Sequence, residues 1–212
     1  MTGRRPFLLA SLSAAVLAAC GRKEKLAAVP AGATVLALGD SITYGTGAAP
    51  ETSYPAVLAQ LTGWNVVNAG VPGDTSAGAL ARVPDLLQQH APRLVLVSIG
   101  GNDFLRRLSP ADTRANIRAI CQQAVAAGAQ VVLVGVPEAS ALAAAARSLS
   151  DHALYAELAG ELKLPVHAGG WAKVLSDPSL RSDPIHANAQ GYEAFARGLA
   201  ERLRELGLAP AR

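Results

Sequence analysis

Short apolar runs recur along the chain, separated by longer stretches in which apolar residues return at helical spacing. The runs have the length of buried strands and lie at 35–38, 65–69, 94–99, 131–136 and 164–167. The stretches between and after them predict helices at 54–61, 76–89, 111–127, 140–162 and 188–206. Strands that alternate with helices indicate a parallel sheet covered on both faces. The sequence therefore predicts an α/β fold whose central parallel sheet has about five strands.

Each of the first three strands is followed by a polar loop that contains glycine. The third run, 94–99, is apolar except for Ser98, which favours a central strand buried on both faces. Because the carboxyl ends of parallel strands lie at one edge of a sheet, the three loops should meet there. We therefore expect Ser41, Gly73 and Asn102, which are distant in sequence, to come together in space.

Ser41 ends the apolar run 35–38 in the sequence Gly39-Asp40-Ser41. Taken alone, a serine at this point is well explained as the cap of the next helix. A nucleophilic serine would need a base, a carboxylate that orients the base, and donors for an oxyanion. The rest of the chain decides between the two interpretations.

The four histidines differ in their surroundings. His186 lies in Asp183-Pro184-Ile185-His186, where a tight turn can return the carboxylate to the imidazole. His90 ends a predicted helix, His152 lies at a polar, exposed helix start, and His167 closes the fifth strand without a nearby carboxylate. Asp183 and His186 are thus the candidate orienting acid and base.

Donors for an oxyanion are also available in the loops. Asn102 carries a side-chain amide, and Gly73 offers a backbone N–H at a loop-to-helix junction. The backbone N–H of Ser41 would be the third donor. We interpret Asp40 and Asp103 as carboxylates that brace these loops by hydrogen bonds to backbone N–H groups.

Four stretches, in this order, resemble the motifs of the SGNH hydrolase superfamily, also called the GDSL esterases and lipases. They are Gly39-Asp40-Ser41-Ile42, Gly70-Val71-Pro72-Gly73-Asp74-Thr75-Ser76, Gly100-Gly101-Asn102-Asp103 and Asp183-Pro184-Ile185-His186. The sequences of these motifs are most similar to those of the bacterial thioesterase I, lysophospholipase and arylesterase branch. Ile42 replaces the leucine of the motif that names the family, which is a conservative apolar change.

The resemblance implies Ser41 as nucleophile, His186 as base and Asp183 as orienting carboxylate. It implies Gly73 and Asn102 as oxyanion donors, together with the Ser41 amide. It also implies a flavodoxin-like three-layer α/β/α sandwich that uses neither a metal nor an organic cofactor.

The part of the site that would hold the acyl group is less well defined by the sequence. Leu105, just after Asn102, and Glu138, in the segment 137–146, are the candidates for substrate binding. Their identities alone do not set the length of acyl chain that would fit.

Composition adds limits. A chain of 212 residues that is 50% apolar and only 4% aromatic suits one domain of small-residue helices packed on a sheet. Its formal charge of +3 includes Arg4 and Arg5, in a segment that we expect to be removed. Without them the chain is close to neutral, so the charge gives no support to nucleic-acid binding.

The N-terminus reads as an export signal. Residues 1–19 combine a short basic start with an apolar stretch too short to span a membrane comfortably. The stretch ends Leu17-Ala18-Ala19-Cys20, which resembles a lipobox and implies cleavage before Cys20 and lipid attachment to it. An ordinary signal peptide is the alternative, and Arg4-Arg5 partly resembles a twin-arginine signal.

We accordingly expect an exported lipoprotein of the periplasm or cell envelope, anchored to the membrane by Cys20. Residues 20–33 would form a tether and 34–212 the hydrolase domain. Cys121 lies among apolar helical positions and reads as a buried, inert thiol. A disulfide between Cys20 and Cys121 would compete with lipidation.

The sequence leaves three functions open. The first is a serine esterase acting on small-molecule or lipid esters, including lysophospholipids and thioesters. The second is a carbohydrate O-deacetylase of the same superfamily, with the same catalytic residues, acting on an envelope polysaccharide. The third is a non-enzymatic lipoprotein on a decayed hydrolase fold, which the complete set of site residues argues against.

Overall fold

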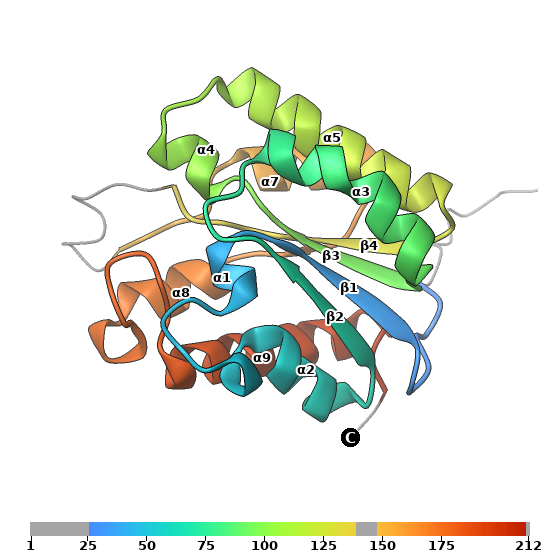
Figure 1. Ribbon diagram of the computed structural model, residues 1–212, viewed down its shortest axis with the longest axis horizontal. Helices are drawn as coiled ribbons and strands as arrows, with labels where there is room; N and C mark the ends of the chain where they lie inside the picture. The colour runs from blue at the N-terminus through green and yellow to red at the C-terminus, as the bar shows by residue number, and fades with distance from the viewer. Residues whose placement is uncertain (1–25, 139–147, 211–212) are drawn as a thin grey trace, which may run out of the picture.

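The computed structural model describes residues 26–138 and 148–210 and has a five-stranded parallel sheet at its centre (Figure 1). The strands, in the spatial order β2-β1-β3-β4-β5, are β1 (Thr34–Gly39), β2 (Asn65–Gly70), β3 (Leu94–Ser98), β4 (Gln130–Val134) and β5 (Val166–His167). This is the order of flavodoxin-like folds. The predicted α/β class, parallel sheet and strand number are confirmed.

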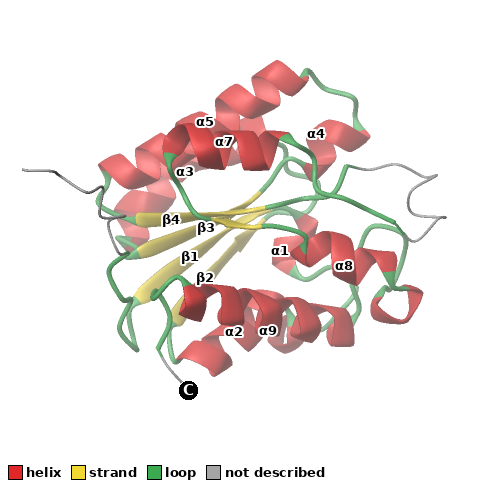
Figure 2. Cartoon of the chain, turned by 180° about the vertical axis from the view of Figure 1, so that it is seen from behind, coloured by secondary structure: helices red, strands yellow, loops and turns green. Residues whose placement is uncertain are grey.

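Helices cover both faces of the sheet, as Figures 1 and 2 show from opposite sides. One face carries α3 (Ser76–His90), α4 (Gly101–Leu105), α5 (Pro110–Ala126) and α7 (Leu154–Leu162). The other carries α1 (Ser41–Tyr44), α2 (Tyr54–Thr62), α8 (Gly170–Ser176) and α9 (Ala189–Glu205). Two short 3₁₀ turns, Pro50–Thr52 and Pro178–Leu180, complete the described elements.

The strand order places a topological switch point between β1 and β3. From β1 the chain moves outward to β2 and then returns to β3 on the other side of β1. At the C-terminal end of β1, Gly39 is level with Gly70 of β2 and Ser98 of β3. The loops that follow these strands therefore begin at one height around a crevice, which is where open α/β sheets build their sites.

The core confirms the expected burial. All five residues of β3 are buried, as predicted for a central strand, and Trp171, Tyr54 and Phe195 pack together against the sheet. Cys121 is fully buried, and its burial raises the thiol pKa to about 12. It is an inert apolar side chain in this setting.

The predicted helix over 140–162 is confirmed over 154–162 and wrong over 148–153. Residues 148–153 are not helical, and α7 begins only at Leu154. The segment instead pairs with the chain after β4: the N–H of Glu138 donates to Ser150 O, and the N–H of His152 donates to Val136 O. Residues 148–153 are Ser-Leu-Ser-Asp-His-Ala, a sequence in which serine and aspartate disfavour a helix interior, so the pairing with the chain after β4 meets little local resistance. Residues 139–147 lie outside the described part.

Two short helices, α4 and α8, occur where no element was predicted, because five and seven residues are too few to show a helical period. Strand β5 is likewise reduced to Val166–His167 from the four residues expected. The other predicted helix boundaries differ from the observed ones by one or two residues. Periodicity does not define the ends of a helix, which depend on capping.

The described part of the predicted tether lies against the domain. Val29 is buried, its N–H donates to Leu208 O, and its carbonyl accepts from Trp64 Nε1 at 3.0 Å. The side chain of Gln130 also exchanges two hydrogen bonds with the backbone of Ala27. The predicted signal segment 1–19 and Cys20 lie outside the described residues. Within 26–138 and 148–210, no helix combines the length and apolarity needed to cross a membrane.

Gly39, the last residue of β1, has no room for a side chain. A Cβ there would lie 2.0 Å from Thr43 Oγ1 and 2.5 Å from the backbone oxygen of Ser98. We expect Gly39→Ala to lower the free energy of unfolding by about 3 kcal/mol, because the buried Thr43 side chain and the backbone of Ser98 must both shift. Urea unfolding measures this.

Gly160 in α7 is the matched control, since a Cβ there would meet nothing within 4 Å. Gly160→Ala should stabilise the domain by about 0.5 kcal/mol, as expected for Ala over Gly inside a helix. Equal stability of the Gly39→Ala and Gly160→Ala variants would contradict the close packing of loop and sheet at Gly39.

Candidate active site

Ser41 stands at the first position of α1, directly beyond β1. Asp40 caps this helix: its Oδ1 accepts the N–H of Ile42 at 3.2 Å. Gly45 ends the helix after one turn with a φ of 103°, a left-handed conformation that favours glycine. The short, capped turn fixes Ser41 at the mouth of the crevice, with its side chain half-buried.

Asp183 and His186 share a tight loop before α9. One carboxylate oxygen of Asp183, Oδ1, accepts the N–H of Ile185 at 2.8 Å and the N–H of His186 at 2.9 Å. Its other oxygen, Oδ2, lies 2.6 Å from His186 Nδ1. The base of the loop is closed where Arg181 pairs with Ala187. The intervening Pro184 has no N–H, so the turn leaves no backbone donor at that position unused.

The imidazole of His186 connects the loop to the serine. His186 Nε2 lies 2.9 Å from Ser41 Oγ, although the two residues are 145 positions apart. The neutral tautomer with its proton on Nδ1 donates to Asp183 and accepts the Ser41 hydroxyl proton at Nε2. This is the hydrogen-bond chain that activates a nucleophilic serine.

The charge on Asp183 persists in this arrangement. Partial burial acts to raise its pKa, but hydrogen bonds from His186 and from the Ile185 N–H outweigh burial, and the pKa is lowered. A carboxylate that stays ionised holds the imidazole in one orientation and stabilises it when it gains a proton.

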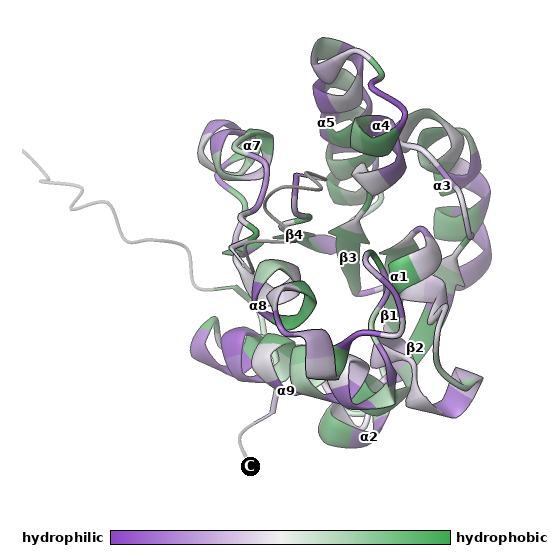
Figure 3. Cartoon of the chain, turned by 90° about the vertical axis from the view of Figure 1, so that its left-hand side faces the viewer, coloured by the Kyte–Doolittle hydropathy of each residue, from purple (hydrophilic) through white to green (hydrophobic). Residues whose placement is uncertain are grey.

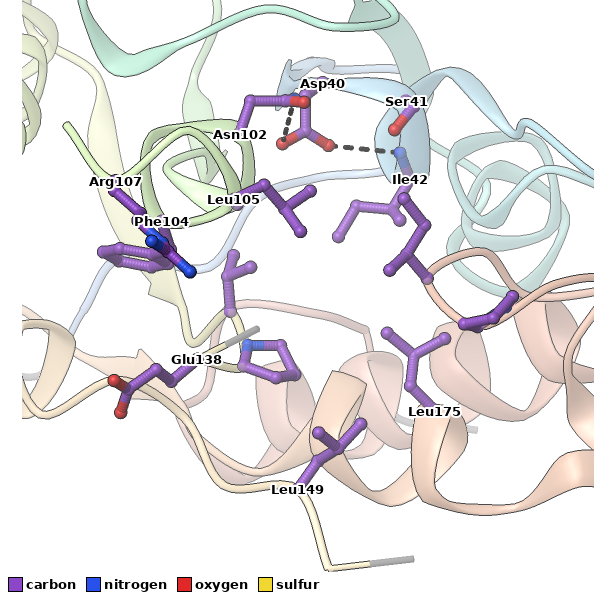
Figure 4. A pocket seen from close by; sticks show the side chains of 15 residues that line it. Asp40, Ser41, Ile42, Asn102, Phe104, Leu105, Arg107, Glu138, Leu149 and Leu175 are labelled. Carbon is purple, nitrogen blue, oxygen red and sulfur yellow. Dashed lines mark hydrogen bonds between the residues drawn. The ribbon is translucent and has the colours of Figure 1, made fainter. Parts of the chain in front are cut away.

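The side-chain amide of Asn102 ties the three loops together. Its Nδ2 donates to Asp74 O at 2.9 Å, in the loop after β2. The same nitrogen lies 3.4 Å from Asp40 Oδ2, in the loop after β1 (Figure 4). The predicted meeting of the three loops at one sheet edge is therefore observed. Whether Asn102 and Gly73 act as oxyanion donors stays a prediction.

Gly73 occupies the third position of a β-turn that runs from Val71 to Asp74. The N–H of Asp74 donates to Val71 O at 3.0 Å, Pro72 is the second residue, and Gly73 has a φ of 78°. These are the features of a type II turn, whose third position favours glycine. Arg106, directly after α4, holds this turn in place, because its Nη2 donates to Gly73 O at 2.8 Å.

Two buried carboxyl groups brace the site, as the sequence suggested. Asp103 accepts the N–H of Ser76 at 2.8 Å and its hydroxyl at 2.5 Å, which joins α4 to the start of α3. Asp40 is 3% exposed, and burial raises its pKa to about 7; the charges of Asp74 and Asp103 act in the same direction. The group next to Ser41 therefore keeps its proton to a much higher pH than an ordinary aspartate.

A cavity of about 420 Å³ opens beside Ser41 (Figure 4). Leu105 and Glu138, the two predicted substrate-binding residues, both line it, and their role in binding stays a prediction. The sequence did not single out the apolar side chains that form most of the remaining wall: Ile42, Phe104, Val136, Leu149, Leu175 and Ile185. They come from separate segments, so only the fold brings them together.

The remaining histidines have other surroundings. His152 lies just before the start of α7, as predicted, but it is half-buried and not exposed, because its ring stacks on Phe104 with centroids 4.5 Å apart. His167 is 8% exposed, and burial lowers its pKa to about 4. His90 ends α3. Within the described residues, no group of three or more His, Cys, Asp and Glu is arranged to hold a metal ion.

Asp40 should leave a signature in the pH dependence of stability. Its pKa is about 7 in the folded chain against an ordinary value of 3.8, so the folded state keeps a proton that the unfolded state has lost. The contribution of Asp40 to the free energy of unfolding therefore falls as the pH rises from about 4 to 7. We expect Asp40→Asn to gain about 2 kcal/mol of unfolding free energy relative to the parent between about pH 5 and pH 8. Urea unfolding at both pH values measures the difference, and parallel pH profiles would contradict the raised pKa.

Comparison with known proteins agrees with this geometry. Residues 37–194 match the model of the GDSL-like lipase/acylhydrolase family. The chain is 36% identical over 178 residues to thioesterase 1/protease 1/lysophospholipase L1 of Escherichia coli K12, covering 82% of this chain and 84% of that one. It is 38% identical over 130 residues to esterase TesA of Pseudomonas aeruginosa, covering 59% of this chain and 65% of the relative.

A solved structure of TesA superposes with a TM-score of 0.72 at 31% identity, covering 82% of this chain and 99% of the other. The family match spans β1 to α9 and so includes every residue of the site described above. The chain belongs to the GDSL-like lipase/acylhydrolase family and is a serine hydrolase.

Proposed function

We propose that the protein is a serine esterase that hydrolyses carboxylic esters through an acyl-enzyme on Ser41. The observation that carries this proposal is the hydrogen-bond chain from Asp183 through His186 to Ser41, with contacts of 2.6 and 2.9 Å. This chain supports one role for each residue: Ser41 as nucleophile, His186 as base and Asp183 as orienting carboxylate.

In the first half of the reaction, Ser41 Oγ attacks the ester carbonyl while His186 Nε2 takes the hydroxyl proton. A tetrahedral intermediate forms, and its collapse expels the alcohol, which receives the proton from His186. In the second half, water attacks the acyl-enzyme with His186 again as base, and the carboxylic acid leaves. Asp183 stays ionised throughout and steadies the imidazolium.

Asn102, the Gly73 N–H and the Ser41 N–H would stabilise the oxyanion. The Asn102 amide has two protons, and two acceptors lie near it in the absence of substrate. The 2.9 Å bond to Asp74 O holds the side chain in place. The longer 3.4 Å contact to Asp40 is the one that we expect the oxyanion to replace.

The cavity beside Ser41 favours an apolar acyl group. Its wall is largely aliphatic, and its volume of about 420 Å³ exceeds what an acetyl group would occupy. Relatives named as a thioesterase/lysophospholipase and as an esterase support the same choice. We propose aryl esters, short-to-medium acyl esters and lysophospholipids as substrates, and no observation favours the O-deacetylase alternative.

We further propose that the enzyme is exported and lipidated at Cys20, on the sequence of residues 1–20. Such an enzyme would not meet cytosolic acyl-CoA, so thioester hydrolysis would be a capability rather than its task. Amphiphilic esters of the cell envelope are the substrates within its reach.

The esterase proposal predicts how the enzyme responds to loss of its nucleophile. Ser41→Ala should abolish hydrolysis of p-nitrophenyl esters and labelling by a fluorophosphonate probe, with the fold intact by circular dichroism. Rates of the parent across an acyl series from acetyl to palmitoyl define the substrate: a maximum beyond acetyl supports the esterase, and activity confined to acetyl supports the deacetylase. Full activity of the Ser41→Ala variant would refute the mechanism.

The oxyanion role predicts a second, more selective effect. Asn102→Ala should lower kcat by about 10²–10³-fold, the usual effect of losing one oxyanion donor, with a much smaller change in KM. Asn116→Ala is the matched control, because Asn116 bonds to Ser76 Oγ and does not contact Ser41 or Asn102. Steady-state kinetics measure kcat and KM for each variant. A change in KM with kcat unaltered would contradict the role of Asn102 as an oxyanion donor.

A further inference from the structure

The exposed apolar side chains of the described residues gather at one end of the molecule. Six large apolar side chains are between 42% and 55% exposed. Five of them follow the carboxyl ends of strands or stand in the loop of His186, and we call them the mouth patch: Tyr44, Val71, Leu105, Leu108 and Ile185. The sixth, Val125, lies near the C-terminal end of α5, at the opposite edge of the sheet.

Contacts between the loops hold the segments of the mouth patch next to one another. The N–H of Val71 donates to Gly39 O, and the backbone of Tyr44 packs on Gly70, which places Tyr44 and Val71 side by side. Arg106 then bridges this loop to α4 by its bond to Gly73 O. Figure 3 looks onto this edge, where α1, α4 and α8 surround the ends of the strands.

The cavity beside Ser41 opens within the mouth patch. Leu105 and Ile185 belong both to the patch and to the cavity wall, so the apolar surface continues inward to the serine. An acyl chain that enters past Leu105 and Ile185 therefore meets apolar side chains along the cavity wall. A protein partner seated on the same surface would close the cavity instead.

Charge adds a second feature of the same surface. Arg106 and Arg107 stand between Leu105 and Leu108, and both are exposed. Among the acidic groups nearby, Asp183 is held by His186, Asp40 is buried, and Glu138 stands on the cavity rim. Arginines interleaved with exposed leucines suit a surface that presents acyl chains and phosphate groups together.

We propose that the mouth patch docks onto anionic lipid surfaces, so that the enzyme draws amphiphilic esters directly from a membrane or lipid aggregate. Isolated apolar side chains on a surface need no explanation, but a patch that surrounds a cavity marks an interaction site. The arginines contact lipid phosphates, and the apolar side chains enter the interface between headgroups and acyl chains. The proposal rests on the esterase function only for the identity of the substrate.

Binding without turnover tests the proposal. Residues 20–212, made without the segment 1–19 so that Cys20 carries no lipid, are prepared with Ser41→Ala to prevent hydrolysis. Sedimentation measures binding to vesicles of phosphatidylcholine alone and of phosphatidylcholine with phosphatidylglycerol. We expect binding to the anionic vesicles that weakens with added salt, because salt screens the arginine–phosphate attraction.

Two variants distinguish vesicle binding through the mouth patch from nonspecific adsorption through any exposed apolar side chain. The combined change Tyr44→Ser, Val71→Ser and Leu108→Ser avoids the cavity wall and the catalytic residues, and should weaken vesicle binding about tenfold or more. Val125→Ser removes an equally exposed side chain at the opposite edge and should leave binding unchanged. In the Ser41 background, the triple variant should keep its rate on a soluble p-nitrophenyl ester but lose rate on vesicle-embedded lysophospholipid.

Several outcomes would overturn the proposal. Absence of binding to anionic vesicles would do so, as would equal losses in the triple and Val125→Ser variants. A parent that is dimeric, becomes monomeric in the triple variant and ignores vesicles would assign the patch to a second copy of the chain. Because the vesicle assay needs no catalysis, its failure is distinguishable from failure of the esterase assignment.

Discussion

The hydrogen bonds of Asn102 are the interaction on which the site depends. One amide reaches Asp74 O in the loop after β2 and Asp40 Oδ2 in the loop after β1, while its backbone belongs to α4, which follows β3. Parallel strands bring three loops to one edge but do not fix their mutual distances. The Asn102 amide fixes them, supported by Asp103, which joins α4 to α3. Loops tied in this way can present donors to a developing charge without reorganising during the reaction.

Two aspartates of the site have opposite electrostatic environments. Asp183, partly exposed and bonded to His186, has a lowered pKa and stays ionised beside a base that must become cationic. Asp40, buried next to the nucleophile, has its pKa raised to about 7, although it accepts the N–H of Ile42 and the long contact from Asn102. A fully ionised Asp40 would repel the oxyanion that the proposed mechanism forms nearby. Its burial therefore costs stability at neutral pH but lessens that repulsion.

The fold also separates the entry of the chain from the site. Residues 26–33 pack beside Trp64 and Leu208 at the N-terminal end of β1, and Ser41 follows its C-terminal end. A tether that begins before Leu26 would thus reach the domain at the edge opposite the mouth patch. For the proposed lipoprotein, the anchored end and the docking surface lie at opposite ends of the sheet. This geometry suits an enzyme that reaches lipid beyond its own point of attachment.

Local sequence determined the strand–helix alternation, the buried central strand and the residues at the strand ends, because periodicity and glycine placement act over a few positions. It also singled out Ser41, Asn102, Asp183 and His186, whose neighbours are short, recognisable motifs. Only the tertiary structure decided the cavity wall, where Leu149, Leu175 and Val136 come from segments with no sequence mark of a shared role. The same holds for the non-helical stretch 148–153, which pairs with residues 136–138, a contact that its own sequence does not indicate. Contacts between distant segments depend on how the whole core packs, and no local pattern records that outcome.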